Sequence, residues 1–411
     1  MLPIALLLNQ MSQDMSEFDL KKNWFEKTFP SLSSVKSFPK GFWKIDSEDM
    51  GLFKLQLMVI IVTWIFSMIS GYHISFLAYW DGPNYVYAAK TMYNIPKINP
   101  WTRVFHYQPS YFACHLPGFP LVIKFFSMLF FAQYWLGDIL AILFTSLVVT
   151  YTFRRFLIAY SAVSDPVWTT RISIFLPLRF FLYKCVGSSE PLFMSFCFLA
   201  FVFLKSNQMV FLLLSLYGAC ITRIEGFAIV GTIGLCYILR FDFIRAILTG
   251  LAFLSPYSIM LFHEYRFNDR YAYIHFNQGH QGLLVFQPFF ALFRYTSNPN
   301  YMHMVFERFA IHIPFAACIC VVFSVSIPLA IFSVVYFFYT SMLNHLDIAR
   351  YSLPSYMPSL LIGMDVLFSS PQMKKHMNFV QIFVMIFGAV YSLGQISSNR
   401  CDHEFLMEVF F

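Results

Sequence analysis

An aspartate follows the first long apolar run of the chain, in the segment YWDGPNY at residues 79–85. Asp81 stands where an expected membrane helix meets water, beside Trp80, an aromatic of the kind that favours the interface. The low-dielectric edge of a membrane raises the basicity of a carboxylate, which can then take a proton from an attacking hydroxyl. The alternative is a structural N-cap, because Asp followed by Gly-Pro is common at a helix start. The sequence therefore indicates Asp81 as a general base and leaves the capping role open.

Four more polar clusters lie between apolar runs or at their ends. They are residues 115–120 (HLPGFP), 187–191 (GSSEP), 221–226 (ITRIEG) and 344–351 (NHLDIARY). Pro and Gly in the first cluster favour irregular backbone, which membrane depth tolerates only where it lines a cavity or packs against protein. Charges so close to apolar runs are costly and usually face a bundle interior or a polar cavity. Together the clusters predict a polar site at one membrane face.

Two arginines in these clusters are candidates for holding a phosphate. The planar guanidinium groups of Arg223 and Arg350 match phosphate oxygens in geometry and charge. The alternatives remain open: Arg223 pairs with Glu225 or Glu190, and Arg350 merely marks a cytoplasmic loop.

A second polar stretch, residues 267–280, mixes aromatic, amide and imidazole side chains. This mixture is typical of segments that stack on sugars and hydrogen-bond to them. His275 and His280 lack the i,i+4 spacing of a helical zinc pair, and no third ligand is evident. The histidines are therefore interpreted as structural or substrate-contacting, and no metal or cofactor is expected.

The elements that must position these clusters are membrane helices. Of 411 residues, 58% are hydrophobic and only 12% are charged, and the mean hydropathy is +0.61. Apolar runs recur along most of the chain, so a single anchor does not explain the average. Since a spanning helix needs about 20 apolar residues, the sequence predicts an all-α, polytopic bundle of about 10–11 spans. The candidate runs are Leu55–Leu77, Pro117–Trp135, Leu136–Phe153, Ile172–Cys185, Pro191–Leu204, Val210–Ile221, Gly226–Leu239, Ile244–Phe262, Phe309–Phe338, Leu353–Phe368 and Asn378–Leu393.

The placement of basic residues predicts the orientation of the bundle. Seven lysines precede or begin the first run, and positive flanks stay in the cytoplasm. The polar stretch after that run, residues 79–115, is then luminal or external. Simple alternation of the spans would place Arg154, Arg155 and Arg171 outside the cytoplasm, against the rule for positive residues. Either one helix is therefore re-entrant or one expected span is wrong. No aromatic or Gly-rich segment accompanies these lysines, as would be typical of a nucleic-acid site. Nucleic acid is therefore not expected as a partner.

The sequence also predicts a division into three parts. Residues 1–50 form a cytoplasmic N-terminal segment with amphipathic helices, 51–395 form the transmembrane domain with polar loops 79–115 and 263–308, and 396–411 form a tail. Most of the eight cysteines lie inside apolar runs without a CxxC pair. They are interpreted as small core residues rather than disulfide partners or zinc ligands.

Taken in order, the clusters resemble the PIG-V-like mannosyltransferases, the family of the GPI mannosyltransferase 2 type. The resemblance covers roughly residues 79–368, and its specificity comes from the order of short motifs. These are Trp80-Asp81-Gly82, Leu116-Pro117-Gly118-Phe119-Pro120, Phe180-Phe181-Leu182, Ser188-Ser189-Glu190-Pro191-Leu192-Phe193, Thr222-Arg223 with Gly226, Phe267-Asn268-Asp269 with His275 and Gln278, and Arg350-Tyr351 with Leu353-Pro354. Glu225 departs from the Pro or Asn that the family often has before this glycine. The loop after Asn268 also lacks the family's Trp-Gly.

The resemblance implies a GT-C-type glycosyltransferase of the endoplasmic reticulum membrane with a luminal site. It would transfer mannose, with inversion, from dolichyl-phosphate mannose to a glycolipid, the second mannose of a GPI precursor. Asp81 would be the general base, and Arg223 and Arg350 would bind the lipid phosphate, with Glu190 positioning one of them. The expected substrate contacts are Trp80, Tyr85, His115, His275, Gln278 and Tyr351.

The resemblance needs no cofactor and leaves room for a small membrane partner subunit besides the surrounding lipids. Three alternatives stay open: a prokaryotic lipid-linked sugar transferase for an envelope glycolipid, an inactive scaffold subunit, and a lipid or solute transporter. Transporters usually show internal repeats with matching broken helices, and none is evident in the sequence.

Overall fold

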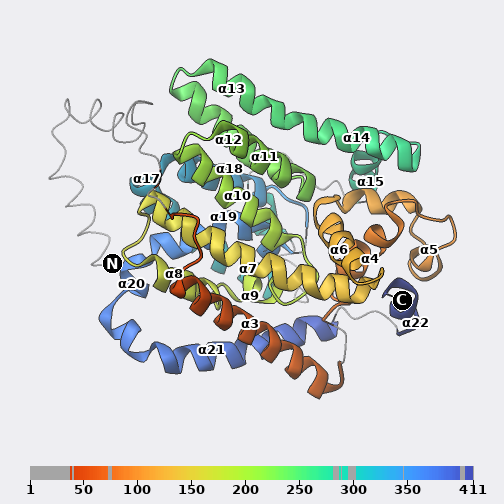
Figure 1. Ribbon diagram of the computed structural model, residues 1–411, viewed down its shortest axis with the longest axis horizontal. Coiled ribbons are helices and arrows are strands. Elements are labelled where there is room, and N and C mark those ends of the chain that lie inside the picture. The colour runs from red at the N-terminus through yellow and green to blue at the C-terminus, as the bar shows by residue number, and fades with distance from the viewer. Residues whose placement is uncertain are drawn as a thin grey trace.

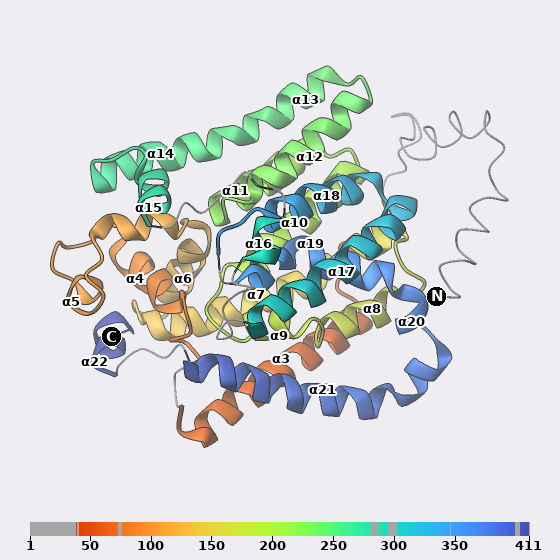
Figure 2. The ribbon, with the colours of Figure 1, turned by 180° about the vertical axis from the view of Figure 1, so that it is seen from behind.

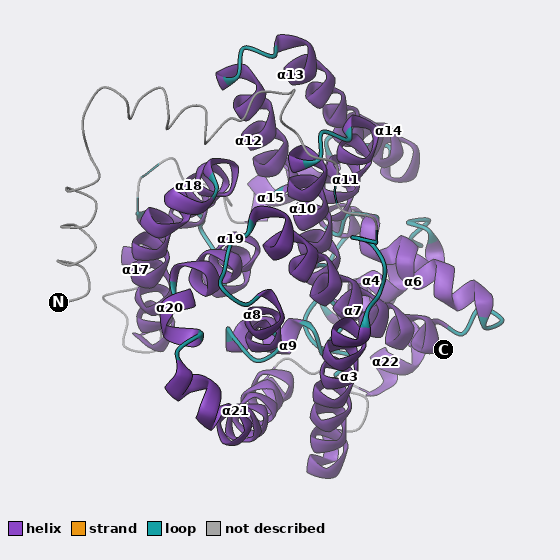
Figure 3. Ribbon diagram, turned by 60° about the vertical axis from the view of Figure 1, so that its left-hand side comes forward, coloured by secondary structure: helices purple, strands orange, loops and turns teal. Residues whose placement is uncertain are grey.

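The protein is all-helical in the part that a computed structural model describes, which is residues 38, 41–72, 76–280, 287, 289–294, 302–345, 347–398 and 403–410. Every element in Figure 3 is a helix or a loop. The elements are α3 (Ser47–Ser67), η2 (Met68–Tyr72), α4 (Gly82–Thr91), α5 (Pro100–Val104), η3 (Pro109–Cys114), α6 (Gly118–Leu129), α7 (Tyr134–Tyr160), α8 (Pro166–Ser173), α9 (Leu178–Tyr183), α10 (Glu190–Lys205), α11 (Met209–Thr222), α12 (Gly226–Leu239), α13 (Phe243–Gly250), η4 (Leu251–Phe253), α14 (Leu254–Phe267), α15 (Ala272–His280), α16 (Phe290–Phe293), α17 (Met302–Val325), α18 (Ile327–Ser341), α19 (Ile348–Gly363), α20 (Asp365–Phe368), α21 (Pro371–Ser398) and α22 (His403–Phe410).

Five helical stretches within the described ranges are long and apolar enough to cross a membrane. They are Ser47–Gly71, Tyr134–Tyr160, Phe243–Phe267, Val305–Val325 and Phe379–Ser397, and α6, α11, α12 and α18 are shorter apolar helices. The prediction of an all-helical polytopic membrane bundle is confirmed. The expected amphipathic helices of the N-terminal segment fall mainly on residues 1–37, outside the described part of the chain. The cysteines from Cys114 to Cys320 are all free.

A buried ion cluster fixes how α3 and α7 run past each other. Arg154, near the C-terminal end of α7, donates to Asp46 at the N-cap of α3 (2.8 Å) and to Asp49 (2.6 Å). Arg155 also pairs with Asp49, whose side chain is 1% exposed. The end of α7 therefore lies beside the start of α3, and the two helices are antiparallel (Figure 1).

This cluster resolves the conflict over the orientation of Arg154 and Arg155. The apolar run that we divided into Pro117–Trp135 and Leu136–Phe153 contains a 12-residue α6 and a single 27-residue α7. The expected division is present, between Leu129 and Tyr134, but α6 is shorter than the roughly 20 residues that a full span needs. Arg154 and Arg155 therefore lie at the same end of the bundle as the start of the first span.

Two further expected runs are interrupted. The run Phe309–Phe338 is divided between α17 and α18 at Ser326, whose backbone is extended and whose hydroxyl accepts the Leu329 N–H (3.4 Å). Pro328 in the first turn of α18 cannot continue the preceding helix, because its nitrogen has no hydrogen to donate. The run Ile172–Cys185 holds the end of α8 and the short helix α9.

The short elements gather at the end of the bundle away from the ion cluster. In Figures 1 and 2, α4, α5, α6, α15 and α22 lie together at that end. The α22 helix packs on α4 and α5, where Phe405 contacts the ring of Trp101 (centroids 4.7 Å apart). This group of short helices covers the segment that carries Asp81.

Candidate functional site

Four helices begin around one cavity of about 200 Å³. Their N-cap residues are Asp81 (α4), Ser189 (α10), Glu225 (α12) and Asp347 (α19). An N-cap side chain normally accepts a hydrogen bond from its own helix. Only Asp347 does so here, whereas the other three side chains make no capping bond and line the cavity instead. Three N-cap side chains are therefore available to a ligand in the cavity instead of capping their helices.

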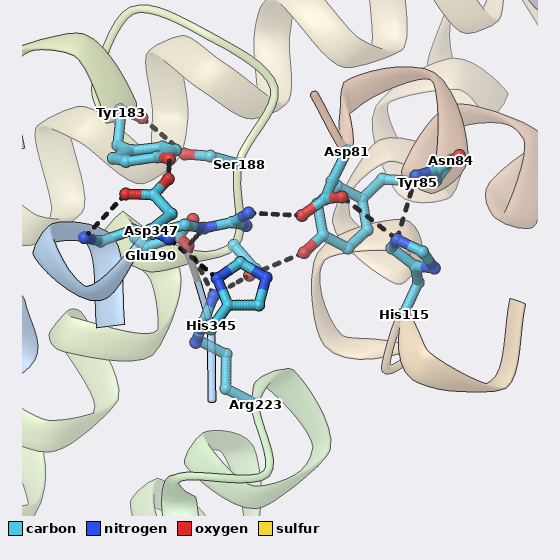
Figure 4. A network of polar contacts seen from close by, with 12 residues as sticks. Asp81, Asn84, Tyr85, His115, Tyr183, Ser188, Glu190, Arg223, His345 and Asp347 are labelled. Atoms are coloured by element: carbon cyan, nitrogen blue, oxygen red, sulfur yellow. Dashed lines mark hydrogen bonds and ion pairs between the residues drawn. The ribbon is translucent and has the colours of Figure 1, made fainter. Parts of the chain in front are cut away.

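Arg350 joins the base candidate to a buried glutamate. Its Nη1 lies 2.6 Å from Asp81 Oδ2, and its Nε donates to Glu190 Oε1. The Arg350 side chain is 4% exposed, that of Glu190 is fully buried, and that of Asp81 is 22% exposed. Figure 4 shows the side chains of Asp81 and Glu190 approaching from different helices. Asp81 thus occupies the N-cap position of α4 but makes no capping hydrogen bond.

Arg223 extends the same network. Its Nη1 donates to Glu190 Oε1 (2.5 Å) and to Ser189 Oγ (3.2 Å). Its Nη2 and Nε reach the two oxygens of Glu225 at 2.8 and 3.3 Å. The alternative that Arg223 pairs with Glu225 or Glu190 therefore holds for both glutamates. The network contains three carboxylates and two guanidinium groups.

The electrostatic environment of Asp81 differs from our expectation. Burial raises the pKa of Asp81, but the positive charge of Arg350 and the contact with His115 lower it by more. The net result is a pKa well below the ordinary range of an aspartate. The expected rise in basicity is wrong for this arrangement, because a neighbouring cation outweighs desolvation. While Arg350 is bound to it, Asp81 is a weak base.

Further polar groups surround the other side of Asp81. His115 Nε2 lies 3.4 Å from Asp81 Oδ1 and 3.0 Å from Asn84 Nδ2. Asn84 also donates to the Tyr111 hydroxyl (3.0 Å), and the Tyr85 hydroxyl lies 3.0 Å from Ser189 Oγ. The predicted residues His115 and Tyr85 therefore both reach the network.

Aromatic rings form much of the remaining cavity wall. Trp80 is 41% exposed and adopts a φ of 50°, a left-handed conformation that bulky residues rarely take. Its side chain lines the cavity beside the base candidate. The ring of Tyr351 lies 5.5 Å from the Arg223 guanidinium and 4.8 Å from the His345 ring. Both aromatics were predicted as substrate contacts, and both line the cavity.

Two predicted contacts are placed elsewhere. His275 and Gln278 are exposed on α15, and neither belongs to the cavity wall. His275 Nδ1 instead lies 2.8 Å from Asp269 Oδ2. Another face of the same helix supplies Tyr273, Phe276 and Asn277 to the cavity.

Several cavity residues escaped the sequence analysis as site residues. The clearest is Glu225, which we had noted as a possible partner of Arg223 and as a departure from the family pattern. The others include Tyr111, Thr222, Tyr273, Phe276, Tyr339 and His345. For Tyr273, Phe276 and Asn277 the signal was available, since i, i+3 and i+4 share one helix face.

The described residues contain no group of three or more His, Cys, Asp or Glu side chains arranged to hold a metal ion. In comparisons with known proteins, no family model and no curated protein matches this chain.

Proposed function

We propose that the protein is a membrane glycosyltransferase that moves mannose from dolichyl-phosphate mannose to a glycolipid acceptor. The observation that carries this proposal is the Asp81–Arg350–Glu190–Arg223 network in a cavity walled by aromatic rings. A carboxylate beside two guanidinium groups suits a reaction that removes a proton and releases a phosphate. Aromatic faces suit the apolar faces of a sugar. The motif order supports the second mannose of a GPI precursor as the product.

The reaction assigns a role to each group in the network. The acceptor hydroxyl attacks the anomeric carbon of mannose and forms a new C–O bond with inversion. The bond between that carbon and the phosphate oxygen breaks, and its electron pair leaves with dolichyl phosphate. The hydroxyl proton passes to Asp81, and the guanidinium groups of Arg350 and Arg223 stabilise the charge on the departing phosphate.

The weak basicity of Asp81 then becomes part of the mechanism. A phosphate oxygen that binds Arg350 competes with Asp81 for the same guanidinium group. As Arg350 turns towards the phosphate, Asp81 loses the cation that depresses its pKa, and its basicity rises. Donor binding thus prepares the base for the acceptor hydroxyl.

The orientation of the bundle supports a luminal site in the endoplasmic reticulum. The lysine-rich N-terminal segment precedes α3, and basic flanks stay in the cytoplasm. The cavity is lined by the N-cap residue of α4, and α4 lies at the opposite end of the bundle from the start of α3 (Figure 1). Lipid-linked substrates would therefore reach it at the luminal side of the membrane.

The substitution Asp81→Asn tests the proposal. Purified protein in lipid vesicles is incubated with labelled dolichyl-phosphate mannose and a glycolipid extract, and label in the glycolipid fraction is measured. We expect label transfer by the wild type and its loss in Asp81→Asn. A matched control is Asp269→Asn, which changes a carboxylate outside the cavity wall and should retain activity. Normal transfer by Asp81→Asn would remove this residue from the mechanism, and substrate flux without transfer would favour a transporter.

A further inference from the structure

A second buried ion pair lies behind the cavity. Arg179 of α9 contacts Asp347 Oδ1 through Nη2 (2.6 Å) and Nε (3.2 Å). The two side chains are 12% and 9% exposed, and neither belongs to the cavity wall. Burial raises the pKa of Asp347, but the charges of Arg179 and Arg350 and the hydrogen bonds from Arg179 and Tyr183 lower it by more, so its carboxylate is ionised. Burying two charges costs desolvation free energy, so a buried pair of this kind is a candidate for a functional role.

Asp347 is connected to Arg350 in two ways. Its Oδ1 accepts the backbone N–H of Arg350 at 3.2 Å, which fixes the first turn of α19. Its Oδ2 accepts the hydroxyl of Tyr183 at 2.9 Å, and the Tyr183 ring lies 5.1 Å from the Arg350 guanidinium. Figure 4 shows Tyr183 and Asp347 on the far side of the network from His115. One carboxylate therefore holds both the backbone of Arg350 and the ring against which its charge rests.

Arg179 anchors this arrangement to another helix. Its Nη1 donates to the Tyr391 hydroxyl (3.1 Å) and to Gln395 Oε1 (2.9 Å), both on α21. Arg179 thus ties α9 and α21 to the start of α19. Because a planar guanidinium group presents its donors in a fixed fork, these contacts also fix its orientation.

We propose that Asp347 is a positioning residue that holds the backbone of Arg350 and the ring beside its guanidinium group, so that this group lies within reach of Asp81, Glu190 and the donor phosphate, and that Arg179 and Tyr183 hold Asp347 in place. The proposal rests on the proposed function of the cavity. An arginine side chain is flexible, and a displacement of about 1 Å at a reacting centre costs roughly a hundredfold in rate. The three residues act on the reaction only through Arg350.

The variant Tyr183→Phe tests this role. It keeps the ring beside Arg350 and removes only the hydroxyl group that donates a hydrogen bond to Asp347. Asp347→Asn is less suitable, since it leaves the Arg179 charge buried without its partner. The matched control is Tyr336→Phe. Tyr336 is fully buried, and its hydroxyl has no hydrogen-bond partner among the described residues.

The test is a double-mutant cycle on kcat/KM for labelled dolichyl-phosphate mannose, with Tyr183→Phe made in the wild type and in Arg350→Lys. We expect Tyr183→Phe to lower kcat/KM about tenfold in the wild type, as for a lost hydrogen bond to a charged group. In Arg350→Lys the same change should have an effect of less than about twofold, because the positioned group is gone. Tyr336→Phe should leave kcat/KM unchanged in both backgrounds.

Equal losses from Tyr183→Phe in both backgrounds would mean a merely structural role and would overturn the inference. An unchanged kcat/KM in the wild-type background would overturn it as well. Failure of the proposed function gives a different result, namely no transfer of label by the wild type itself.

Discussion

The substitution Gly82→Ala tests whether the backbone beside Asp81 has room for a side chain. A Cβ at Gly82 would lie 2.4 Å from the carbonyl oxygen of Leu77, and ordinary van der Waals contact begins at 3.4 Å. The backbone must therefore move by about 1 Å, because the obstructing atom belongs to the main chain and cannot rotate away. Asp81 is the adjacent residue and must move with it. A displacement of this size at a reacting group costs roughly a hundredfold in rate.

Initial rates of label transfer from dolichyl-phosphate mannose measure this effect, normalised to the protein that elutes as a folded species in size-exclusion chromatography. Gly231→Ala in α12 is the matched control, because an added Cβ there meets no atom within 4 Å. It should keep the wild-type rate and gain about 0.5–1 kcal/mol in stability from the better helix former. The reasoning would be refuted if folded Gly82→Ala transferred mannose at more than about half the wild-type rate.

Three further outcomes are expected. Arg223→Lys keeps the charge but loses the guanidinium fork, so kcat/KM for the donor should fall about tenfold in the same transfer assay. Asp49→Asn removes the buried negative charge that Arg154 and Arg155 share. Denaturant titrations should show a free energy of unfolding lower by about 3–5 kcal/mol, and the transfer rate per folded molecule should be unchanged. Asp46 has a pKa of about 2, because Arg154 outweighs the effect of burial. Its stabilisation is therefore complete above its ordinary pKa of 3.8 and disappears as the pH falls through about 2. Thermal unfolding should show the difference between wild type and Asp46→Asn shrinking over that window.

Four of the five charged residues of the network were predictable from the sequence, and Glu225 was not among the predicted site residues. A charge next to an apolar run must find a partner or water, so Asp81, Glu190, Arg223 and Arg350 were expected to face one polar site. Their pairing was not predictable, because it depends on how distant helix starts approach one another. The contact between Arg350 and Glu190 joins positions 160 residues apart, and no local spacing encodes it.

The exact position of the boundary between α6 and α7 was missed for a local reason. A tight turn with left-handed backbone usually contains Gly or Asn. Here Phe131 and Ala132 take those conformations, with φ of 53° and 62°, so the apolar run gives no local signal of the turn, and the expected division at residue 136 falls after it. The same kind of limit applies to α15, where the side facing the cavity depends on the rotation of one short helix. Its aromatics were recognised as a group, but the chosen contacts His275 and Gln278 lie on the wrong face for the cavity.

The N-cap interpretation of Asp81 and its chemical role are connected through the helix ends. Each helix N-terminus carries the equivalent of about half a positive charge, and α4, α10 and α12 all begin at the cavity. The network itself has three carboxylates for two guanidinium groups. The helix ends offset the excess negative charge, and they favour the entry of a further anion in the same way. A phosphate that draws Arg350 from Asp81 would remove the strongest cation from that carboxylate and raise its basicity, although the start of α4 continues to favour its ionised form.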